Sequence, residues 1–455
     1  MITHLIYMFI ILCLFSCEDE LHIPPPDDVD NQVTEYEQFG TPFNEIPATQ
    51  DIIMYEVNLR AYSPEGDLQG VIDKLDHIES LGINVIWLMP IHPIGQVNSV
   101  NSPYSVKNYK AVGSEYGDLE DLRTLTTEAH NRGIAIIMDW VANHTSWDNN
   151  WIQNKNWYSQ DANGNIIHPP GTNWQDVADL NYDNENMREA MIDAMKYWVY
   201  EANIDGFRCD YADGVPFDFW KEAWQNLDSI PDRQFIYFAE GTRNDHFDAG
   251  FDLNFSWQFY GALKQDFNNQ VAGKIIEVDK KEKANTPENK SWVRFTTNHD
   301  ESAWDATPIS LFNGTEGALA ASMATIFTGG VPLIYGSQEV GTANNIPFFT
   351  NSTINWDNNP KMLSAYQKML QFYSNSTVAK TGENTVFPHN DILCFKKSFE
   401  NEEILIITNL RDYTINFSFP PELESSEWSD IMAESTLTLN NDITLAPYQF
   451  YILQK

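Results

Sequence analysis

The stretch EDLRTLTTEAHNRGIAIIMDWV (Glu120–Val141) contains one complete helix-to-strand step of the fold that we expect. Asp118, just before it, is a residue type that caps the start of a helix, and Gly133 suits the left-handed turn that ends one. The run IAIIMDWV that follows is apolar on both faces until Asp139, as in a buried strand. A helix that leads into a buried strand is the repeating step of a parallel sheet.

This alternation of short apolar strands and amphipathic helices extends over residues 51–375. The expected strands are DIIMYEVNL (51–59), NVIWLMP (84–90), IAIIMDWV (134–141), IDGFRCD (204–210), FIYFAE (235–240), GFDLNF (250–255), WVRFTTNHD (292–300) and VPLIYG (331–336). Eight strands with helical connections predict a (β/α)8 TIM barrel of the α/β class. The Trp-, Asn- and Gly-rich segment at about 143–179 is too long for an ordinary loop, so we expect a small domain inserted after strand 3.

The last part of the chain, residues 376–455, changes to a period of two. ILCFKKSF, EILIITNL, TINFSF and APYQFYILQ alternate apolar and polar residues, as strands with one buried face do. This pattern predicts a C-terminal antiparallel β-sandwich domain.

The composition restricts the partners. The chain has 455 residues, with 27 Lys and Arg against 65 Asp and Glu, and its formal charge is −38. Such a charge repels phosphate, which excludes nucleic acid and fits a neutral ligand. Cys209 and Cys394 lie far apart in the sequence, and we expect both to be buried free thiols.

The N-terminal run MITHLIYMFIILCLFSC is too short to span a bilayer as a mature anchor. Its end, Leu14–Cys17, resembles a bacterial lipobox, which implies a signal peptide over 1–16 and a lipid on Cys17. An ordinary secretory signal with an incidental cysteine is the alternative. Residues 17–50, which include LHIPPPDDVDNQ, are expected to form an acidic, Pro-rich flexible tether.

The acidic residues Glu18–Glu20 resemble the signal that sends some Bacteroides-type lipoproteins to the cell surface. We therefore expect a protein that is lipid-anchored to the outer membrane and faces the cell exterior, with the periplasmic face as the alternative. Contact with the membrane is expected only through this N-terminal lipid.

Charged and polar motifs stand where four of the barrel strands should end. They are DWVANH (139–144), GFRCD (206–210), FAE (238–240) and TTNHD (296–300). The C-terminal strand ends of a barrel converge on one face, which carries the active site in enzymes of this fold. A structural salt bridge explains any one motif but not a series at successive strand ends. Alternation sends Arg208 and Asp210 to one face of their strand and Cys209 to the other.

In this order the four motifs resemble the signature regions of the α-amylase family of retaining glycoside hydrolases. VADLN (Val177–Asn181) is similar to a fifth region, and GVPLIYGSQEVG (Gly330–Gly341) is similar to the segment at strand eight. The resemblance covers about residues 51–455 and implies a bacterial lipoprotein member of this family. The inserted segment would then be domain B and the C-terminal part domain C.

The resemblance implies that Asp210 is the nucleophile, which forms a covalent glycosyl-enzyme, and that Glu240 is the general acid/base. Arg208 would keep Asp210 ionised and oriented for the bound sugar. Asp300 would hold sugar hydroxyls and help to stabilise an oxocarbenium-like transition state. These roles need a raised pKa at the acid and a low pKa at the nucleophile, with the two carboxyl groups ~5–5.5 Å apart.

Three further residues are implied to bind the sugar at the cleavage point. His144 and His299 match the family's histidines, which hydrogen-bond this sugar. Tyr104, in SPYSVKNY, resembles the tyrosine whose ring stacks under it. A satisfied core histidine and a surface-loop tyrosine are the structural alternatives.

Asn143 and Asp179 resemble ligands of the structural calcium ion that pins domain B to the barrel. Oxygen donors of this kind suit Ca²⁺, and the further ligands are usually backbone carbonyls. The alternative is that both residues hydrogen-bond local loops. Asp139 belongs to the same motif as Asn143 and is interpreted as structural support.

One motif departs from the family pattern. Many α-amylases carry Lys-His three and four residues after the nucleophile, where the pair contacts the leaving side of starch. Asp213 and Gly214 stand there in this chain, so the leaving-side subsites differ, although the Gly214 carbonyl can still bind calcium. For most of the tryptophans of the inserted segment, Trp147, Trp151, Trp157 and Trp174, we expect a place in the core of that small domain, with stacking on glucan as the alternative.

The main hypothesis is an endo-acting α-amylase that hydrolyses α-1,4 bonds of starch and maltooligosaccharides, beside other surface glycan-uptake proteins. An α-glucosidase, a cyclomaltodextrinase or a transglycosylase for short α-glucans is the alternative. Cyclomaltodextrinase relatives usually carry an N-terminal β-domain, whereas only the tether precedes the first strand here. A catalytically inactive glycan-binding lipoprotein is disfavoured, because it should lack one of Asp210, Glu240 and Asp300.

Overall fold

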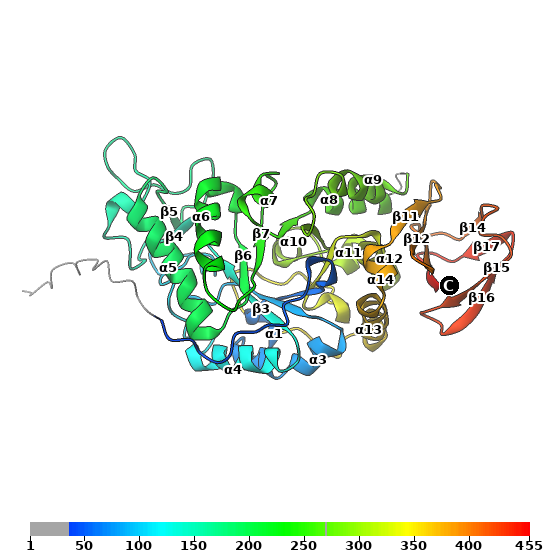
Figure 1. Cartoon of the computed structure of the whole chain (residues 1–455), viewed down its shortest axis with the longest axis horizontal. Coiled ribbons are helices and arrows are strands. Elements are labelled where there is room, and N and C mark those ends of the chain that lie inside the picture. Colours follow the sequence, from blue (N-terminus) through cyan, green and yellow to red (C-terminus); the bar gives the residue numbers. More distant parts are fainter. Residues whose placement is uncertain (1–35, 269–270) are drawn as a thin grey trace, which may run out of the picture. The chain divides into compact units, whose positions relative to one another are not determined.

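The computed structural model describes residues 36–268 and 271–455 (Figure 1). The predicted signal peptide, the lipobox with Cys17 and most of the tether therefore lie outside the described residues. Among the described residues, no helix is both long enough and apolar enough to cross a membrane.

Eight parallel strands form a closed barrel, which confirms the predicted fold. They are β1 (Met54–Val57), β2 (Val85–Leu88), β3 (Ala135–Trp140), β6 (Gly206–Cys209), β7 (Ile236–Ala239), β8 (Leu253–Phe255), β9 (Ser291–Arg294) and β10 (Val331–Tyr335). Their order around the barrel is β1-β10-β9-β8-β7-β6-β3-β2. Seven of them lie within the predicted strands and are buried along their whole length, as apolar runs in a parallel sheet are. β9 begins one residue before its predicted strand, and its first two residues are only half-buried.

Helices connect the strands and cover the outside of the barrel (Figure 1). They are α1 (Leu59–Tyr62), α2 (Leu68–Ile72), α3 (Leu75–Ser80), α4 (Leu119–His130), α5 (Glu185–Ala202), α6 (Phe217–Asp228), α7 (His246–Ala249), α8 (Trp257–Phe267), α9 (Lys274–Lys283), α10 (His299–Trp304), α11 (Pro308–Leu311), α12 (Thr315–Thr328), α13 (Pro360–Asn375) and α14 (Thr377–Thr381). Asp118 caps α4 in a capping box, and Gly133 has a φ of 69°, as predicted.

The core has two layers around the strands. One cluster of apolar side chains, which includes Trp87, Phe238 and Phe255, fills the barrel interior, and a larger cluster lies between strands and helices. Cys209 belongs to the larger, outer cluster, so it faces away from Arg208 and Asp210. Cys209 and Cys394 are both buried free thiols, as predicted.

The inserted segment contains a two-stranded antiparallel sheet of β4 (His144–Ser146) and β5 (Val177–Asp179). Trp157 is buried there, and Trp147 and Trp151 pack against the main apolar cluster, as predicted for core residues.

The C-terminal part forms the predicted antiparallel β-domain. Its strands are β11 (Glu383–Val386), β12 (Ile392–Phe399), β13 (Glu402–Asn409), β14 (Ile415–Ser418), β15 (Ser426–Asp430), β16 (Ser435–Leu439), β17 (Asp442–Leu445) and β18 (Phe450–Gln454). A six-stranded sheet, β11-β12-β13-β18-β15-β16, and a two-stranded sheet, β14-β17, share one apolar core.

A lysine joins this domain to the barrel. Lys397 of β12 is fully buried, and its Nζ donates to the carbonyl of Phe327 at 3.4 Å and to that of Ala379. These carbonyls belong to the last turns of α12 and α14, which lack partners within their helices. Burial lowers the pKa of Lys397 to about 7. Through this contact a side chain of the C-terminal domain caps the C-terminal end of the barrel helix α12.

The expected flexible tether ends earlier than predicted. From Tyr36 onward the chain packs on the barrel: the Tyr36 hydroxyl donates to Asp193 at 2.8 Å, and the buried Phe43 stacks on His130 at 4.3 Å. The tether prediction is therefore wrong for residues 36–50, because aromatic side chains there bury apolar surface against the helices.

Candidate active site

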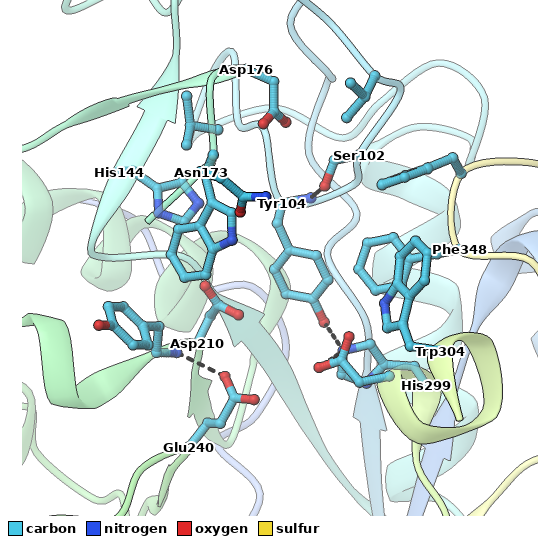
Figure 2. A pocket seen from close by; sticks show the side chains of 16 residues that line it. Ser102, Tyr104, His144, Asn173, Asp176, Asp210, Glu240, His299, Trp304 and Phe348 are labelled. Atoms are coloured by element: carbon cyan, nitrogen blue, oxygen red, sulfur yellow. Dashed lines mark hydrogen bonds and ion pairs between the residues drawn. The ribbon is translucent and has the colours of Figure 1, made fainter. Parts of the chain in front are cut away.

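A cavity of about 620 Å³ opens at the C-terminal ends of the barrel strands (Figure 2). Most of the predicted site residues come together in it: Tyr104, His144, Asp210, Glu240, His299 and Asp300 all line the cavity. Arg208, fully buried, lies beneath them. Most of these residues, which are far apart in the sequence, meet because they stand at or beyond the C-terminal end of a barrel strand, whereas Tyr104 comes from the long loop between β2 and α4.

Arg208 is the centre of the cavity floor. Its Nη1 lies 2.9 Å from Asp139 Oδ1 and 3.3 Å from Asp210 Oδ1, and its Nη2 lies 2.9 Å from Glu240 Oε2. Burial alone would lower the pKa of Arg208, but the surrounding carboxylates, first Asp139 and then Glu240, hold it well above its usual value. One guanidinium therefore positions both predicted catalytic carboxylates.

The backbone explains this convergence. The strand register pairs Asp139 with Arg208 and Cys209 with Ala239, so Asp210 and Glu240 each follow one residue later on neighbouring strands. Gly206 begins β6, and a Cβ at that position would lie 2.0 Å from the carbonyl oxygen of Ile236. Only glycine allows β7 to approach so closely.

The electrostatics of Asp210 differ from the expectation. Burial raises the pKa of its carboxyl group well above the usual value, the charge of Glu240 raises it further, and Arg208 only partly opposes both. Arg208 favours the charged form of Asp210, as the sequence suggests, while burial and the Glu240 charge act against it. The charge of Glu240 acts against a second negative charge on Asp210, and both carboxylates contact the same guanidinium. A proton on Glu240 removes the repulsion that disfavours charge on Asp210.

Asp139 supports the floor, as the sequence suggested. It is fully buried and accepts hydrogen bonds from Arg208, from Trp87 Nε1 at 3.1 Å and from the Tyr104 hydroxyl at 3.0 Å. Burial raises the pKa of the Asp139 carboxyl, and the Arg208 charge opposes this. Asp139 thus fixes the guanidinium and the tyrosine ring relative to each other.

His299 is held as a cation by carboxylates on two sides. Its Nδ1 lies 2.5 Å from Glu56 Oε1, and its Nε2 lies 3.6 Å from Asp300 Oδ2 and 2.8 Å from the Tyr104 hydroxyl. Burial would lower the pKa of His299, but the charges of Asp300 and Glu56 raise it to about 9. The imidazolium therefore donates to Glu56 and to Tyr104, whose own hydroxyl donates to Asp139.

Glu56 was missed by the sequence interpretation. It is fully buried in β1, and its Oε2 has no hydrogen-bond partner among the described residues. The available signal was a glutamate inside the otherwise apolar strand Met54–Val57, since an ionisable residue in a buried strand needs a partner.

His144 differs from His299 in charge. Burial lowers its pKa to about 4, so the ring is neutral at neutral pH. The Asn143 amide lies 3.2 Å from Nδ1, which can accept from it, and the proton of the neutral ring is then on Nε2. The cavity therefore offers one neutral and one charged imidazole.

The rim carries aromatic side chains beyond Tyr104, namely Trp174, Tyr211, Trp304, Phe348 and Phe349. Trp174 packs edge-on against His144 at 5.6 Å and against Tyr211 at 5.1 Å, and it lines the cavity. Trp174 therefore fits the alternative given for the tryptophans of the inserted segment, a ring that faces the ligand cavity. Trp304 and Phe348 line the opposite part of the rim (Figure 2).

Asp213, at the departure from the family pattern, braces the loop after Glu240. It accepts from the backbone N–H of Thr242 at 2.9 Å and of Arg243 at 3.2 Å, and it lies 2.7 Å from His246 Nε2. Burial would raise the pKa of Asp213, but these hydrogen bonds, the one from His246 first, hold it well below its usual range. Asp213 therefore holds the loop after Glu240 in place.

The predicted calcium ligands lie close together in the inserted segment. A Cβ at Gly214 would lie 2.3 Å from Asn143 Oδ1, so the Gly214 backbone packs directly on Asn143. Asp179 pairs with His144, the neighbour of Asn143, in the β4–β5 ladder. Burial raises the pKa of Asp179, opposed by a hydrogen bond from Ser159. No group of three or more His, Cys, Asp or Glu side chains in the described chain forms a metal site.

Comparison with known proteins agrees with this geometry. The family model for the α-amylase catalytic domain matches residues 39–176 and 157–376, and that for the maltogenic amylase C-terminal domain matches residues 384–452. Alpha-amylase 3 of Dictyoglomus thermophilum is 26% identical over 90% of this chain and 94% of its own length. The cyclomaltodextrinase of Thermoanaerobacter pseudethanolicus is 24% identical over 86% of this chain and 71% of its own.

Solved structures agree as well. An α-amylase from Lactobacillus plantarum superposes with a TM-score of 0.80 at 26% identity, over 90% of this chain and 99% of that one. A maltogenic α-amylase from Thermotoga neapolitana gives a TM-score of 0.80 at 25% identity, again over 90% and 99%. Because the catalytic-domain model spans well over half of the chain and meets the barrel described above, this protein belongs to the α-amylase family of glycoside hydrolases.

Proposed function

We propose that this glycoside hydrolase is an α-amylase that cleaves α-1,4-glucosidic bonds in starch and maltooligosaccharides with retention of configuration. The observation that carries the proposal is the single buried Arg208 that contacts both Asp210 and Glu240 at the floor of a cavity. A retaining hydrolase needs one carboxylate as nucleophile and one carboxylic acid beside it.

In this proposal Asp210 attacks the anomeric carbon while Glu240 protonates the leaving glycosidic oxygen. Glu240 then removes a proton from water, which hydrolyses the covalent glycosyl-enzyme and restores the starting state. The shared cation supports this division, because protonation of Glu240 favours the charged form of Asp210. General acid/base assistance of this kind contributes ~10²–10⁴-fold in rate.

The remaining polar groups hold the sugar in the reactive position. Tyr104 offers a ring face that Asp139 and His299 fix through its hydroxyl. His299 and Asp300 present one positive and one negative group to sugar hydroxyls, and His144 presents a neutral donor. A uniformly acidic chain with this pocket suits a neutral glucan.

The test is a time course of the products formed from soluble starch, with Asp210→Asn as the control. A mixed ladder of maltooligosaccharides at early times, absent in the variant, is the expected result. Wild-type protein that is inert on all α-glucans, or a variant as active as wild type, would overturn the proposal.

An enzyme for short α-glucans is the second candidate. Asp213 stands at the position where many relatives carry a lysine that contacts the leaving side of starch. Its carboxylate is instead engaged by the loop after Glu240, through Thr242 and His246. The similarity to a cyclomaltodextrinase points the same way. Rapid cleavage of maltotriose together with slow action on starch would favour this candidate.

We propose in addition that Asn143, Asp179 and the Gly214 carbonyl hold a structural calcium ion. All three are oxygen donors, and the desolvated carboxyl of Asp179 would be stabilised as an anion by a cation. The ion would tie the inserted segment to the loop after Asp210. We expect EGTA to lower the melting temperature of wild-type protein and to leave that of Asp179→Ala unchanged. An equal response of both proteins would refute the site.

We also propose that Cys17 is lipidated and anchors the enzyme at the outer membrane, facing the exterior, where other glycan-uptake proteins would be its neighbours. The support is the lipobox-like Leu14–Cys17 followed by Glu18–Glu20. Labelling with an alkyne fatty acid, compared between wild type and Cys17→Ser, tests the anchor. Protease accessibility on intact cells separates the surface from the periplasmic face.

A further inference from the structure

The loop after the nucleophile and the loop after the acid/base are bonded directly to each other. The first comprises residues 210–215, which follow β6, and the second comprises residues 240–246, which follow β7. Ala212 N–H donates to the Glu240 carbonyl at 2.8 Å, and Tyr211 N–H donates to the Glu240 carboxylate, also at 2.8 Å. The first loop therefore holds Glu240 both at its backbone and at its side chain.

Asp213 continues this junction beyond Glu240. Its carboxylate accepts from the backbone N–H of Thr242 at 2.9 Å and from the Thr242 hydroxyl at 2.8 Å. It also accepts from Arg243 N–H at 3.2 Å and lies 2.7 Å from His246 Nε2. In the opposite direction, Arg243 Nη1 donates to the carbonyls of Asp213 and Val215 at 3.3 and 3.1 Å. One side chain thus fixes the backbone directly after the acid/base.

The packing at this junction is close. A Cβ at Gly241 would lie 2.4 Å from Asp213 Oδ1 and 2.4 Å from His246 Nε2, so the loop needs glycine there to pass the two side chains. His246 is fully buried, and its ring packs edge-on against Phe251 at 5.3 Å. The imidazole is therefore fixed, and it fixes the carboxylate that it contacts.

The nucleophile has supports of its own. Asp210 N–H donates to the Trp140 carbonyl at 3.0 Å, and its Oδ1 lies 3.3 Å from Arg208 Nη1. Tyr211 and Glu240 are among the described residues that line the catalytic cavity, whereas Asp213 is not. An effect of Asp213 on the reaction therefore passes through the position of Glu240.

We propose that Asp213, fixed by His246, is a positioning residue for the general acid. It sets where the Glu240 carboxyl lies relative to Asp210, and a general acid must lie within hydrogen-bond reach of the leaving oxygen. This inference rests on the proposed function and makes one step of it more specific. Protonation of the leaving oxygen depends on Asp213, whereas attack by Asp210 does not.

The test compares two substrates that differ in their need for an acid. The sugar that leaves from maltopentaose must be protonated, whereas the phenolate of 2,4-dinitrophenyl α-maltoside leaves without a proton. In Asp213→Ala we expect kcat on maltopentaose to fall about ten- to a hundredfold, because a catalytic group displaced by ~1 Å loses up to ~10²-fold in rate. Asp213→Asn keeps an acceptor oxygen and should recover part of this loss.

The second measurement is the release of phenolate in a single turnover, with enzyme in excess over the dinitrophenyl maltoside. This rate reports the attack of Asp210 alone, and in both Asp213 variants it should stay within about twofold of wild type. A residue that served only the stability of the fold would slow both substrates by the same factor.

The matched control is Asp245→Asn, an acidic residue of the same loop whose carboxylate pairs with the Arg243 guanidinium at 2.9 Å. It should leave both rates unchanged. An unchanged maltopentaose rate in Asp213→Ala, or an equal loss on the two substrates, would overturn the positioning role. Wild-type protein that cleaves neither substrate would instead overturn the proposed function.

Discussion

The floor and the rim of the cavity differ in burial, in chemistry and in the elements that supply them. The floor consists of Asp139, Arg208 and the carboxylates of Asp210 and Glu240, all at strand ends and joined by ion pairs. The rim consists of aromatic rings on loops and helix ends, such as Trp174 and the exposed Trp304. The floor fixes charges for one reaction, whereas the rim offers apolar faces to whichever sugars extend from it.

This difference predicts different consequences of substitution. Changes in the floor should alter the chemical step or the stability of the fold, because a buried charge there loses one of its ion-pair partners. Changes in the rim should alter affinity and product length and leave the chemical step nearly unchanged.

The largest effect is expected at Glu240. Glu240→Gln cannot protonate the leaving oxygen, so kcat on maltooligosaccharides should fall by ~10²–10⁴-fold. A 2,4-dinitrophenyl α-glycoside needs no acid for departure, so its initial burst of phenolate should persist, followed by slow turnover. Stopped-flow absorbance measures both phases. Asp210→Asn serves as the comparison, since it should abolish the burst as well. A lost burst in Glu240→Gln would argue against the assignment.

The next largest effect is expected for Asp139→Asn, on the free energy of unfolding. The substitution removes a buried negative charge from Arg208, while Trp87 and Tyr104 keep an acceptor oxygen. The free energy of unfolding should fall by about 3 kcal/mol, because the guanidinium stays buried with less compensation. Urea denaturation monitored by tryptophan fluorescence gives the value. A variant as stable as wild type would show that Arg208 does not depend on this partner.

A smaller, pH-dependent effect is expected at Glu56. The folded-state pKa of His299, about 9, exceeds the ordinary value of 6.5. The stabilisation by the imidazolium is therefore complete below pH values at which the unfolded histidine titrates, and it is lost as the pH rises through about 9. In Glu56→Gln one of the carboxylates that hold the charge is gone, so the alkaline limb of activity and of stability should move to lower pH.

Profiles of kcat/KM and of melting temperature against pH test this shift. Both limbs should move in the same direction, since they report the same proton on His299. An alkaline limb that stays in place in Glu56→Gln would mean that another group sets it.

The smallest effect is expected at Trp174 on the rim. Trp174→Ala removes a ring that packs edge-on against His144 and Tyr211 without a hydrogen bond to either. We expect KM for starch to rise about threefold with kcat nearly unchanged, as for the loss of one aromatic contact. Initial rates over a range of starch concentrations decide this. A large fall in kcat would remove the distinction between floor and rim.

How well the sequence predicts each region follows from the same difference. Arg208, Asp210, Glu240 and Asp300 stand at or just beyond strand ends, where the barrel fixes their position, so short motifs were sufficient to find them. The pKa of Asp210 could not be predicted in this way. It depends on how many charges surround one buried carboxyl, and only the folded structure brings Glu240 and Asp139 next to it.

The aromatic residues of the rim could not be predicted from the sequence, and the reason is physical. Trp304 and Phe348 are separated by more than forty residues, and they meet because the Asn345 amide and Ile346 N–H bond to α10. Such contacts follow from tertiary packing and have no periodic signature. The rule that small domains need large side chains does not tell which tryptophan of the inserted segment is the exception, and it is the loop before β5 that places Trp174 in the cavity.

Lys397 has a consequence for how such proteins can be recombined. The C-terminal domain corresponds to a separate family model, which suggests a module that could be exchanged between relatives. Yet its β12 supplies the donor for carbonyls at the ends of two helices, α12 of the barrel and α14 at the junction of the two parts. A foreign domain without a lysine at this place would leave both carbonyls buried and unpaired. Lys397 and the two carbonyls that it binds should therefore come from the same protein. Chimaeras of this enzyme should be joined at another point in the chain.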